Sequence, residues 1–141
     1  MDSMKSIRFD ISMKNLMILQ LVDVLFSEIV LDETTTPNLE EVFLQNVPDE
    51  CKMKILLPKL KFFSIHYYDA QVDYSWIHSM LACATKLEHF DSYKLRVDEL
   101  KFASNNLNKI ILRRAECLES LVIYGPKLRE LSLQVRMLAK F

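Results

Sequence analysis

The stretch Val97–Leu133, VDELKFASNNLNKIILRRAECLESLVIYGPKLRELSL, repeats one apolar pattern four times. The pattern is L-x-x-L-x-L, in which another large apolar residue can replace leucine, and successive copies start ten, eleven and ten residues apart. A constant step of this kind indicates a repeat architecture, in which each unit buries its apolar residues against the next. The four copies are Val97-Leu100-Phe102, Leu107-Ile110-Leu112, Leu118-Leu121-Ile123 and Leu128-Leu131-Leu133.

The same pattern extends back to the N-terminal part of the sequence in two interleaved series. Starts in the first series are 20 to 27 residues apart, which is within the range of leucine-rich repeats. We therefore predict a single domain over residues 1–141, an α/β, strand-dominated solenoid of about six coils that each give one strand to a common sheet. The first series starts at Leu16, Leu39, Leu60, Leu87, Leu107 and Leu128, and the second at Met4, Phe26, Val97 and Leu118.

The return path of each coil is expected to be a strand in the early and late coils and a short helix in the two middle coils. Pro48–Leu57 opens with a proline and two acidic residues, which favours a helix start. Val72–Lys86 has apolar residues at helical spacing and predicts the longer helix. Leu16–Leu31 fits two strands or one amphipathic helix, and its phase with the downstream pattern favours strands. Ile7–Ile11 alternates with period two and predicts a strand.

The composition excludes several classes of function. The 18 basic and 19 acidic residues give a net charge of −1, so we expect no concentrated basic face and no nucleic-acid binding. Gly125 is the single glycine, which rules out glycine-rich phosphate loops and leaves the turns to Asn, Asp and Pro. We expect no cofactor. The apolar runs are too short for a membrane span and the N-terminus has no leader pattern, so we expect an intracellular protein, cytoplasmic or nuclear.

Three cysteines and three histidines could suggest a metal or catalytic site. The cysteines are far apart and form no C-x-x-C pair, which argues against a disulfide framework and a zinc module. The histidines have no cysteine or carboxylate partners at the short spacing that zinc sites use, and no serine lies in a nucleophile elbow. We predict neither a metal site nor an enzyme. These residues are Cys51, Cys83, Cys117, His66, His78 and His89.

The pattern also predicts a surface, because successive side chains of a strand point to opposite faces of the sheet. The outward positions of the first series begin acidic and aromatic and become basic along the solenoid. Aromatic residues with arginine are typical of interface hot spots, so we expect a protein partner on this face. Alternatively, Phe43 and Phe62 pack under a loop or against each other. The predicted partner-binding residues are Phe43, Phe62, His66, Tyr67, His89, Lys109, Ile111 and Arg113.

Two kinds of segment alternate in the last third, CLESLVI at Cys117–Ile123 and GPKLRELSL at Gly125–Leu133. Thr36–Leu39 and Leu57–Leu60 share with the second kind a Pro-x-Leu sequence that leads into the pattern. In these features the chain resembles the leucine-rich-repeat regions of F-box proteins from plants and protists. The resemblance implies a leucine-rich-repeat fold and a role as the substrate-recognition part of a ubiquitin-ligase receptor.

The chain departs from this family in two respects. No F-box pattern is visible, because Met4–Leu31 already has the repeat pattern. No capping segment is evident at either end, so a neighbouring subunit or missing chain is expected to cover the ends of the core. A structural subunit or scaffold within a larger assembly is therefore the alternative function.

Overall fold

The structure, a computed structural model, describes residues 5–7, 13–24, 26–47, 51–66 and 76–136. Within these ranges the chain forms a parallel β-solenoid of about five turns that contains one short helix. The elements are β1 (Lys5–Ile7), β2 (Ile18–Val22), β3 (Phe26–Asp32), β4 (Glu41–Gln45), β5 (Lys52–Leu56), β6 (Phe62–His66), α1 (Trp76–Cys83), β7 (His89–Tyr93), β8 (Glu99–Ala103), β9 (Lys109–Glu116), β10 (Ser120–Tyr124) and β11 (Glu130–Arg136).

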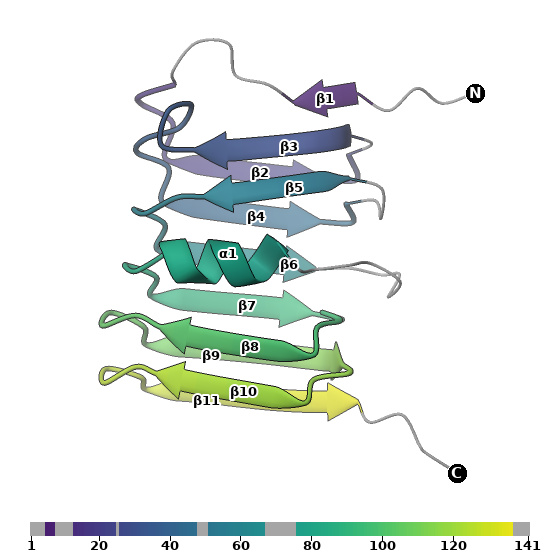
Figure 1. Cartoon of the computed structure of the whole chain (residues 1–141), viewed down its shortest axis with the longest axis vertical. Helices are drawn as coiled ribbons and strands as arrows, with labels where there is room; N and C mark the ends of the chain where they lie inside the picture. Colours follow the sequence, from purple (N-terminus) through teal and green to yellow (C-terminus); the bar gives the residue numbers. More distant parts are fainter. Residues whose placement is uncertain (1–4, 8–12, 25, 48–50, 67–75, 137–141) are drawn as a thin grey trace, which may run out of the picture.

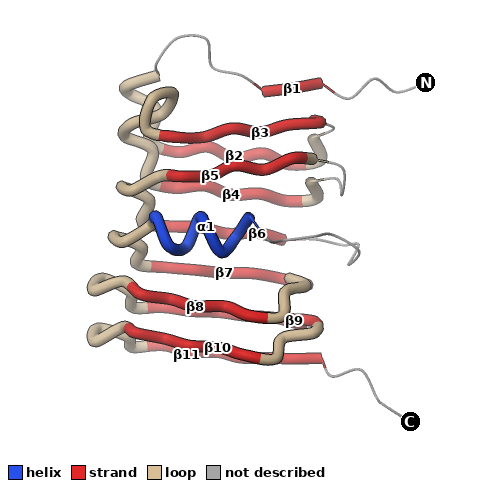
Figure 2. Tube along the Cα trace, viewed as in Figure 1, coloured by secondary structure: helices blue, strands red, loops and turns tan. Residues whose placement is uncertain are grey.

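One wall of the solenoid is a six-stranded sheet in the order β11-β9-β7-β6-β4-β2. The opposite wall consists of the sheet β1-β3-β5, the helix α1 and the sheet β8-β10 (Figures 1 and 2). All strand pairs are parallel. In Figure 1 the strands of the opposite wall run leftward in front and the six-stranded sheet runs rightward behind while the chain descends, so the coil is right-handed.

The same tight turn leads into each strand of the six-stranded sheet. The N–H of the first leucine of the pattern donates to the carbonyl three residues earlier, for example Leu39 to Thr36 at 3.2 Å. Pro37, Pro58 and Pro126 occupy the second position of this turn, where the fixed φ of proline matches the turn geometry. This shared turn keeps the pattern in phase from coil to coil. The turns cover residues 13–16, 36–39, 57–60, 84–87, 104–107 and 125–128.

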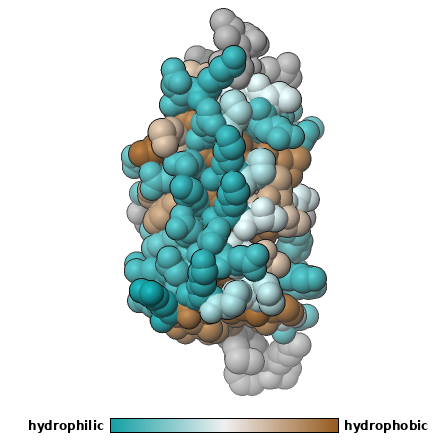
Figure 3. Space-filling view, turned by 90° about the vertical axis from the view of Figure 1, so that its left-hand side faces the viewer, coloured by the Kyte–Doolittle hydropathy of each residue, from teal (hydrophilic) through white to brown (hydrophobic). Residues whose placement is uncertain are grey.

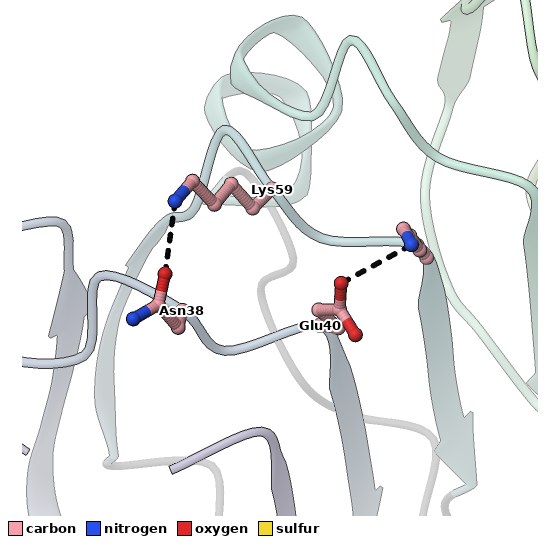
Figure 4. A network of polar contacts seen from close by, with 4 residues as sticks. Asn38, Glu40 and Lys59 are labelled. Atoms are coloured by element: carbon pink, nitrogen blue, oxygen red, sulfur yellow. Dashed lines mark hydrogen bonds and ion pairs between the residues drawn. The ribbon is translucent and has the colours of Figure 1, made fainter. Parts of the chain in front are cut away.

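These turns stack along one edge of the molecule, where Figure 3 shows a hydrophilic stripe. Asn38 Nδ2 donates to the Lys14 carbonyl of the preceding turn at 2.6 Å, and Lys59 Nζ donates to Asn38 Oδ1 at 2.9 Å (Figure 4). Lys61 forms an ion pair with Glu40 at 3.1 Å beside them. Exposed contacts of this kind stabilise weakly, but each one links two adjacent coils and so favours their register.

At the other edge, several coils leave the six-stranded sheet through a residue with left-handed backbone conformation. The φ angle is 55° at Asp23, 57° at Asn46, 59° at Lys94 and 53° at Arg114. Asp and Asn tolerate this conformation, whereas it costs other side chains about 1–2 kcal/mol because Cβ approaches the following carbonyl oxygen. The sequence predicts Asn and Asp in such turns, but it does not predict Lys94 and Arg114.

The core is a stack of equivalent positions from successive coils. Val42, Phe63, Phe90 and Ile110 are paired across the six-stranded sheet and are completely buried. The rings of Phe63 and Phe90 are 5.7 Å apart, and Phe102 of the opposite wall lies 5.0 Å from Phe90. Burying each aromatic side chain contributes about 1.5–3 kcal/mol. Because these contacts join neighbouring coils, the coils stabilise one another and none is stable by itself.

The helix predicted over Pro48–Leu57 is wrong. Residues Lys52–Leu56 form β5 and pair with β3, while residues 48–50 lie outside the described part of the chain. Met53 and Ile55 are less exposed than Lys52 and Lys54, so the period-two alternation outweighs the helix-start signal of the proline and acidic residues. The middle coils therefore contain one described helix, not two.

The helix predicted over Val72–Lys86 is present in shortened form as α1, and residues 72–75 lie outside the described part of the chain. Its buried residues are Ile77, Met80 and Leu81. This coil has the longest step, 27 residues from Leu60 to Leu87. A helix rises about 1.5 Å per residue and a strand about 3.3 Å, so a helix needs more residues to cross the same wall.

The strands predicted in the early coils correspond to β1, β2 and β3. Leu16–Leu31 contains the strands β2 and β3, so the strand interpretation is confirmed and the amphipathic helix is wrong. Of the strand predicted over Ile7–Ile11, Ile7 lies in β1 and residues 8–12 are outside the described ranges. The solenoid has about five turns, compared with the expected six.

Candidate protein-binding face

The outer face of the six-stranded sheet carries three rows of side chains at right angles to the strands. The parallel register puts the residues of each row on adjacent strands, so that neighbours within a row face the same side. The first row is Ile18, Glu41, Phe62, His89, Lys109 and Glu130, the second is Gln20, Phe43, Ser64, Asp91, Ile111 and Ser132, and the third is Val22, Gln45, His66, Tyr93 and Arg113.

An aromatic strip crosses the middle of this face and consists of Phe43, Phe62 and His89. The ring centroids of Phe43 and Phe62 are 4.8 Å apart, and those of Phe62 and His89 are 4.3 Å apart. All three residues are half-buried, so they contact one another and still reach the surface. Such aromatic contacts hold the rings in place, and rigid rings lose little conformational entropy when a partner binds.

The surroundings of His89 lower the pKa of its imidazole. Burial lowers the pKa of His89 below 6.5, and the positive charge of Lys109 in the same row lowers it further, against the opposing effects of Asp91 and Glu130. The imidazole is therefore mainly neutral at neutral pH and can stack on Phe62 without burying a charge. Lys109 in turn forms an ion pair with Glu130 at 3.1 Å.

His66 and Asp91 form a looser polar pair next to the strip. His66 Nε2 lies 3.5 Å from Asp91 Oδ2, which is long for a hydrogen bond. Among the described residues, His66 Nε2 and Asp91 Oδ1 have no hydrogen-bond partner although both atoms are buried. Buried polar atoms without partners are uncommon and unfavourable. The pair therefore places two buried, incompletely satisfied polar side chains next to the aromatic strip.

The predicted partner-binding residues occupy different environments on this face. Arg113 is exposed, whereas Ile111 faces outward but is only 8% exposed because its neighbours cover it. Tyr67 lies outside the described residues. The structure brings the others together on β4, β6, β7 and β9.

Tyr93 was not among the predicted binding residues, although it lies centrally. Lys94 Nζ is 5.7 Å from the centre of its ring, and Arg114 Nη1 donates to its hydroxyl at 3.2 Å. The ring of His66 lies 6.2 Å away. The available signal in the sequence was that Tyr93-Lys94 and Arg113-Arg114 follow the pattern at equivalent positions of two coils.

Cys51, His78 and Cys83 lie on or beside the opposite wall, away from this face. No group of three or more His, Cys, Asp or Glu side chains that could hold a metal is found among the described residues. Burial raises the pKa of the Cys51 thiol to about 11 and raises that of Cys83, which disfavours the reactive thiolate. His78 Nε2 lies 2.7 Å from the carbonyl oxygen of Glu99, so this contact joins α1 to β8.

The opposite wall has a groove of about 420 Å³ between α1 and β8. Apolar side chains from both elements line it, together with the His78 contact to β8. The groove lies where the helix replaces a strand and separates the two sheets of this wall (Figure 1). It is therefore a consequence of the change from strand to helix in one coil. Its lining residues are His78, Leu81, Ala82, Glu99, Lys101 and Ala103.

Comparisons of the chain with protein-family models, with curated proteins and with solved structures found no match. Within the described ranges, no helix has the length and apolar character needed to cross a membrane.

Proposed function

We propose that this chain is a protein-binding module and that its partner contacts the outer face of the six-stranded sheet. The observation that carries the proposal is the aromatic strip, in which Phe43, Phe62 and His89 are stacked but remain partly accessible. Partly exposed aromatic residues beside arginine are frequent anchors of protein interfaces. Arg113 lies one strand from Tyr93 on the same face.

In this proposal the chain is a leucine-rich-repeat protein of the type joined to F-box domains, and the sheet recognises the substrate of a ubiquitin ligase. The recurring L-x-x-L-x-L pattern and the Pro-x-Leu turns support the repeat family. The ligase role is supported only by the resemblance in sequence, since a repeat fold serves many functions.

The proposal is tested by affinity purification and mass spectrometry with the wild-type chain and two variants. Phe62→Ala should reduce capture of the specific partner at least about tenfold, because truncation of an aromatic hot-spot residue costs about 2 kcal/mol or more. The matched control Lys101→Ala changes an exposed residue of β8 on the opposite wall and should leave capture unchanged. Equal capture by all three proteins would contradict the proposal.

The alternative function is that of a structural subunit in a larger assembly. It is favoured by Leu131 and Leu133 of β11, which occupy inward pattern positions and are each 46% exposed. A neighbouring subunit could bury these residues. Capture that depends on Leu131 and Leu133, but not on Phe62, would support this alternative.

A further inference from the structure

Five basic residues lie together where β7, β9 and β11 end. The backbone of Lys94 donates to the Arg113 carbonyl at 2.9 Å, Tyr93 pairs with Arg113, and Arg96 and Arg136 both pair with Glu116 in the parallel register. We call this group the basic corner; its members are Lys94, Arg96, Arg113, Arg114 and Arg136.

The basic corner has an excess of positive charge in a protein whose net charge is −1. Glu116 supplies a carboxylate within the group, 3.9 Å from Arg136 Nη1, and its side chain is mostly buried. Lys94 and Arg96 make other contacts, so neither is counted as a free positive charge. Arg113 and Arg114 are exposed and extend the positive charge to the surface.

The equivalent corner of the early coils has a different chemistry. There Asp23 and Asn46 take the left-handed positions, and Asn46 Nδ2 donates to Asp23 Oδ1 at 2.7 Å. Lys94 and Arg114 adopt the same backbone conformation at a cost that Asp and Asn largely avoid. Backbone geometry therefore does not explain the choice of basic residues, whereas a requirement for positive charge does.

Tyr93 connects the basic corner to the aromatic strip. Its ring lies beside Lys94 Nζ and its hydroxyl accepts from Arg114, while its side chain is on the same face of β7 as His89. Tyr93 is four residue steps along the strand from His89, which is about 13 Å. A short extended segment could contact both regions at once.

We propose that the basic corner binds an acidic segment of the protein partner, rich in Asp and Glu, while an apolar residue of that segment contacts the aromatic strip. Charge complementarity supports this partner, because arginine side chains bind carboxylates through paired hydrogen bonds. This inference rests on the proposed function and adds the chemical class of the partner.

Nucleic acid is the competing polyanion. It would require basic residues tracking a backbone of regularly spaced phosphates. The basic corner is confined to the ends of three strands, and the rows beside it contain Glu41, Asp91 and Glu130. An acidic peptide segment fits this limited area better.

The test is selection of short random peptides displayed on phage, using the wild-type chain and Arg113→Gln/Arg114→Gln. Wild-type binders should be enriched in Asp and Glu next to an apolar residue, and synthetic copies should bind the double variant at least about tenfold more weakly. The matched control Lys52→Gln/Lys54→Gln removes two exposed charges from β5 on the opposite wall and should select the same peptides as wild type. Thermal unfolding of all three proteins checks that they are folded.

The outcomes separate this inference from the proposed function. Binders that require Phe62 but show no acidic enrichment, or that bind the Arg113→Gln/Arg114→Gln variant equally well, overturn the inference and leave the proposed function standing. Binders that are indifferent to Phe62→Ala overturn the proposed function itself. Tighter binding of a single-stranded RNA oligonucleotide than of any selected peptide also overturns the inference.

Discussion

The early coil formed by β4 and β5 and the late coil formed by β9 and β10 share a turn, an apolar pattern and a parallel register. They differ in what they present to solvent. The early coil has Gln45 at the end of its outer face and Asn46 where the chain leaves the sheet, whereas the late coil has Arg113 and Arg114 at the equivalent positions. Inward residues and turns thus determine the repeat, and the outward residues are available to define a binding surface.

The largest expected difference between early and late coils concerns the apolar pattern itself. Leu44 of β4 and Leu133 of β11 occupy the same pattern position, but Leu44 is 2% exposed and Leu133 is 46% exposed. Leu44→Ala should lower the free energy of unfolding by about 2–5 kcal/mol because it leaves a cavity in the core. Leu133→Ala should cost about 1 kcal/mol or less, since much of the side chain is already in contact with water.

Urea denaturation of the two variants measures this difference. Equal losses would contradict the comparison, because they would mean that the last strand is packed as tightly as the middle of the sheet.

A smaller effect of opposite sign on the free energy of unfolding is expected at the left-handed residues where the chain leaves the six-stranded sheet. Arg114→Gly should stabilise the protein by about 0.5–1 kcal/mol, since glycine adopts φ near 53° without the Cβ conflict and the lost contact with Tyr93 is exposed. Asn46→Gly should instead be neutral or slightly destabilising, because asparagine tolerates the conformation and its hydrogen bond to Asp23 is lost.

The free energy of unfolding of both glycine variants provides the measurement. Stabilisation by both substitutions would show that Asn46 is as strained as Arg114, and destabilisation by both would remove the argument that Arg114 is retained for its charge.

The smallest effect is a pH dependence of the free energy of unfolding that arises from His89. This residue lies in the row of side chains that joins the early and late coils. The pKa of His89 is lowered in the folded protein by burial and by Lys109, so the unfolded chain binds the proton more tightly. This contribution to stability is complete above the unfolded pKa of about 6.5 and is lost as the pH falls from there through the folded pKa. Opposing carboxylates, Asp91 and Glu130, limit its size.

The substitution His89→Phe keeps an aromatic ring beside Phe62 and removes the titration. As the pH falls from 7.5 to 5, the free energy of unfolding of wild type should therefore decrease relative to that of this variant. A difference that stays constant over this range would mean that the folded and unfolded pKa values of His89 are equal.

Much of the architecture could be predicted from the sequence because inward leucines and turn prolines recur in phase. The early strands β2 and β3 follow from this phase, and the helix α1 follows from the helical spacing of the apolar residues in Val72–Lys86. The helix predicted over Pro48–Leu57 failed because local helix-start residues were weighted above the period-two alternation of Lys52–Leu56.

The candidate site could be predicted only in part. The strand alternation placed Phe43, Phe62 and His89 on one face, but it could not predict their ring stacking, which depends on side-chain rotamers. It could not show that neighbours cover Ile111, nor that Lys94 and Arg114 take left-handed conformations beside Tyr93. Those features arise from contacts between coils, and a one-dimensional pattern does not contain them.

The most direct test of the central claim combines binding and stability for one double variant, Phe43→Ala/Phe62→Ala. Titration of the captured partner should give a dissociation constant at least about a hundredfold higher than for wild type, because two stacked anchors are removed from the outer face. The free energy of unfolding should change by less than half as much as the binding free energy. Unchanged affinity, or a loss of stability that accounts for the whole loss of binding, would contradict the account.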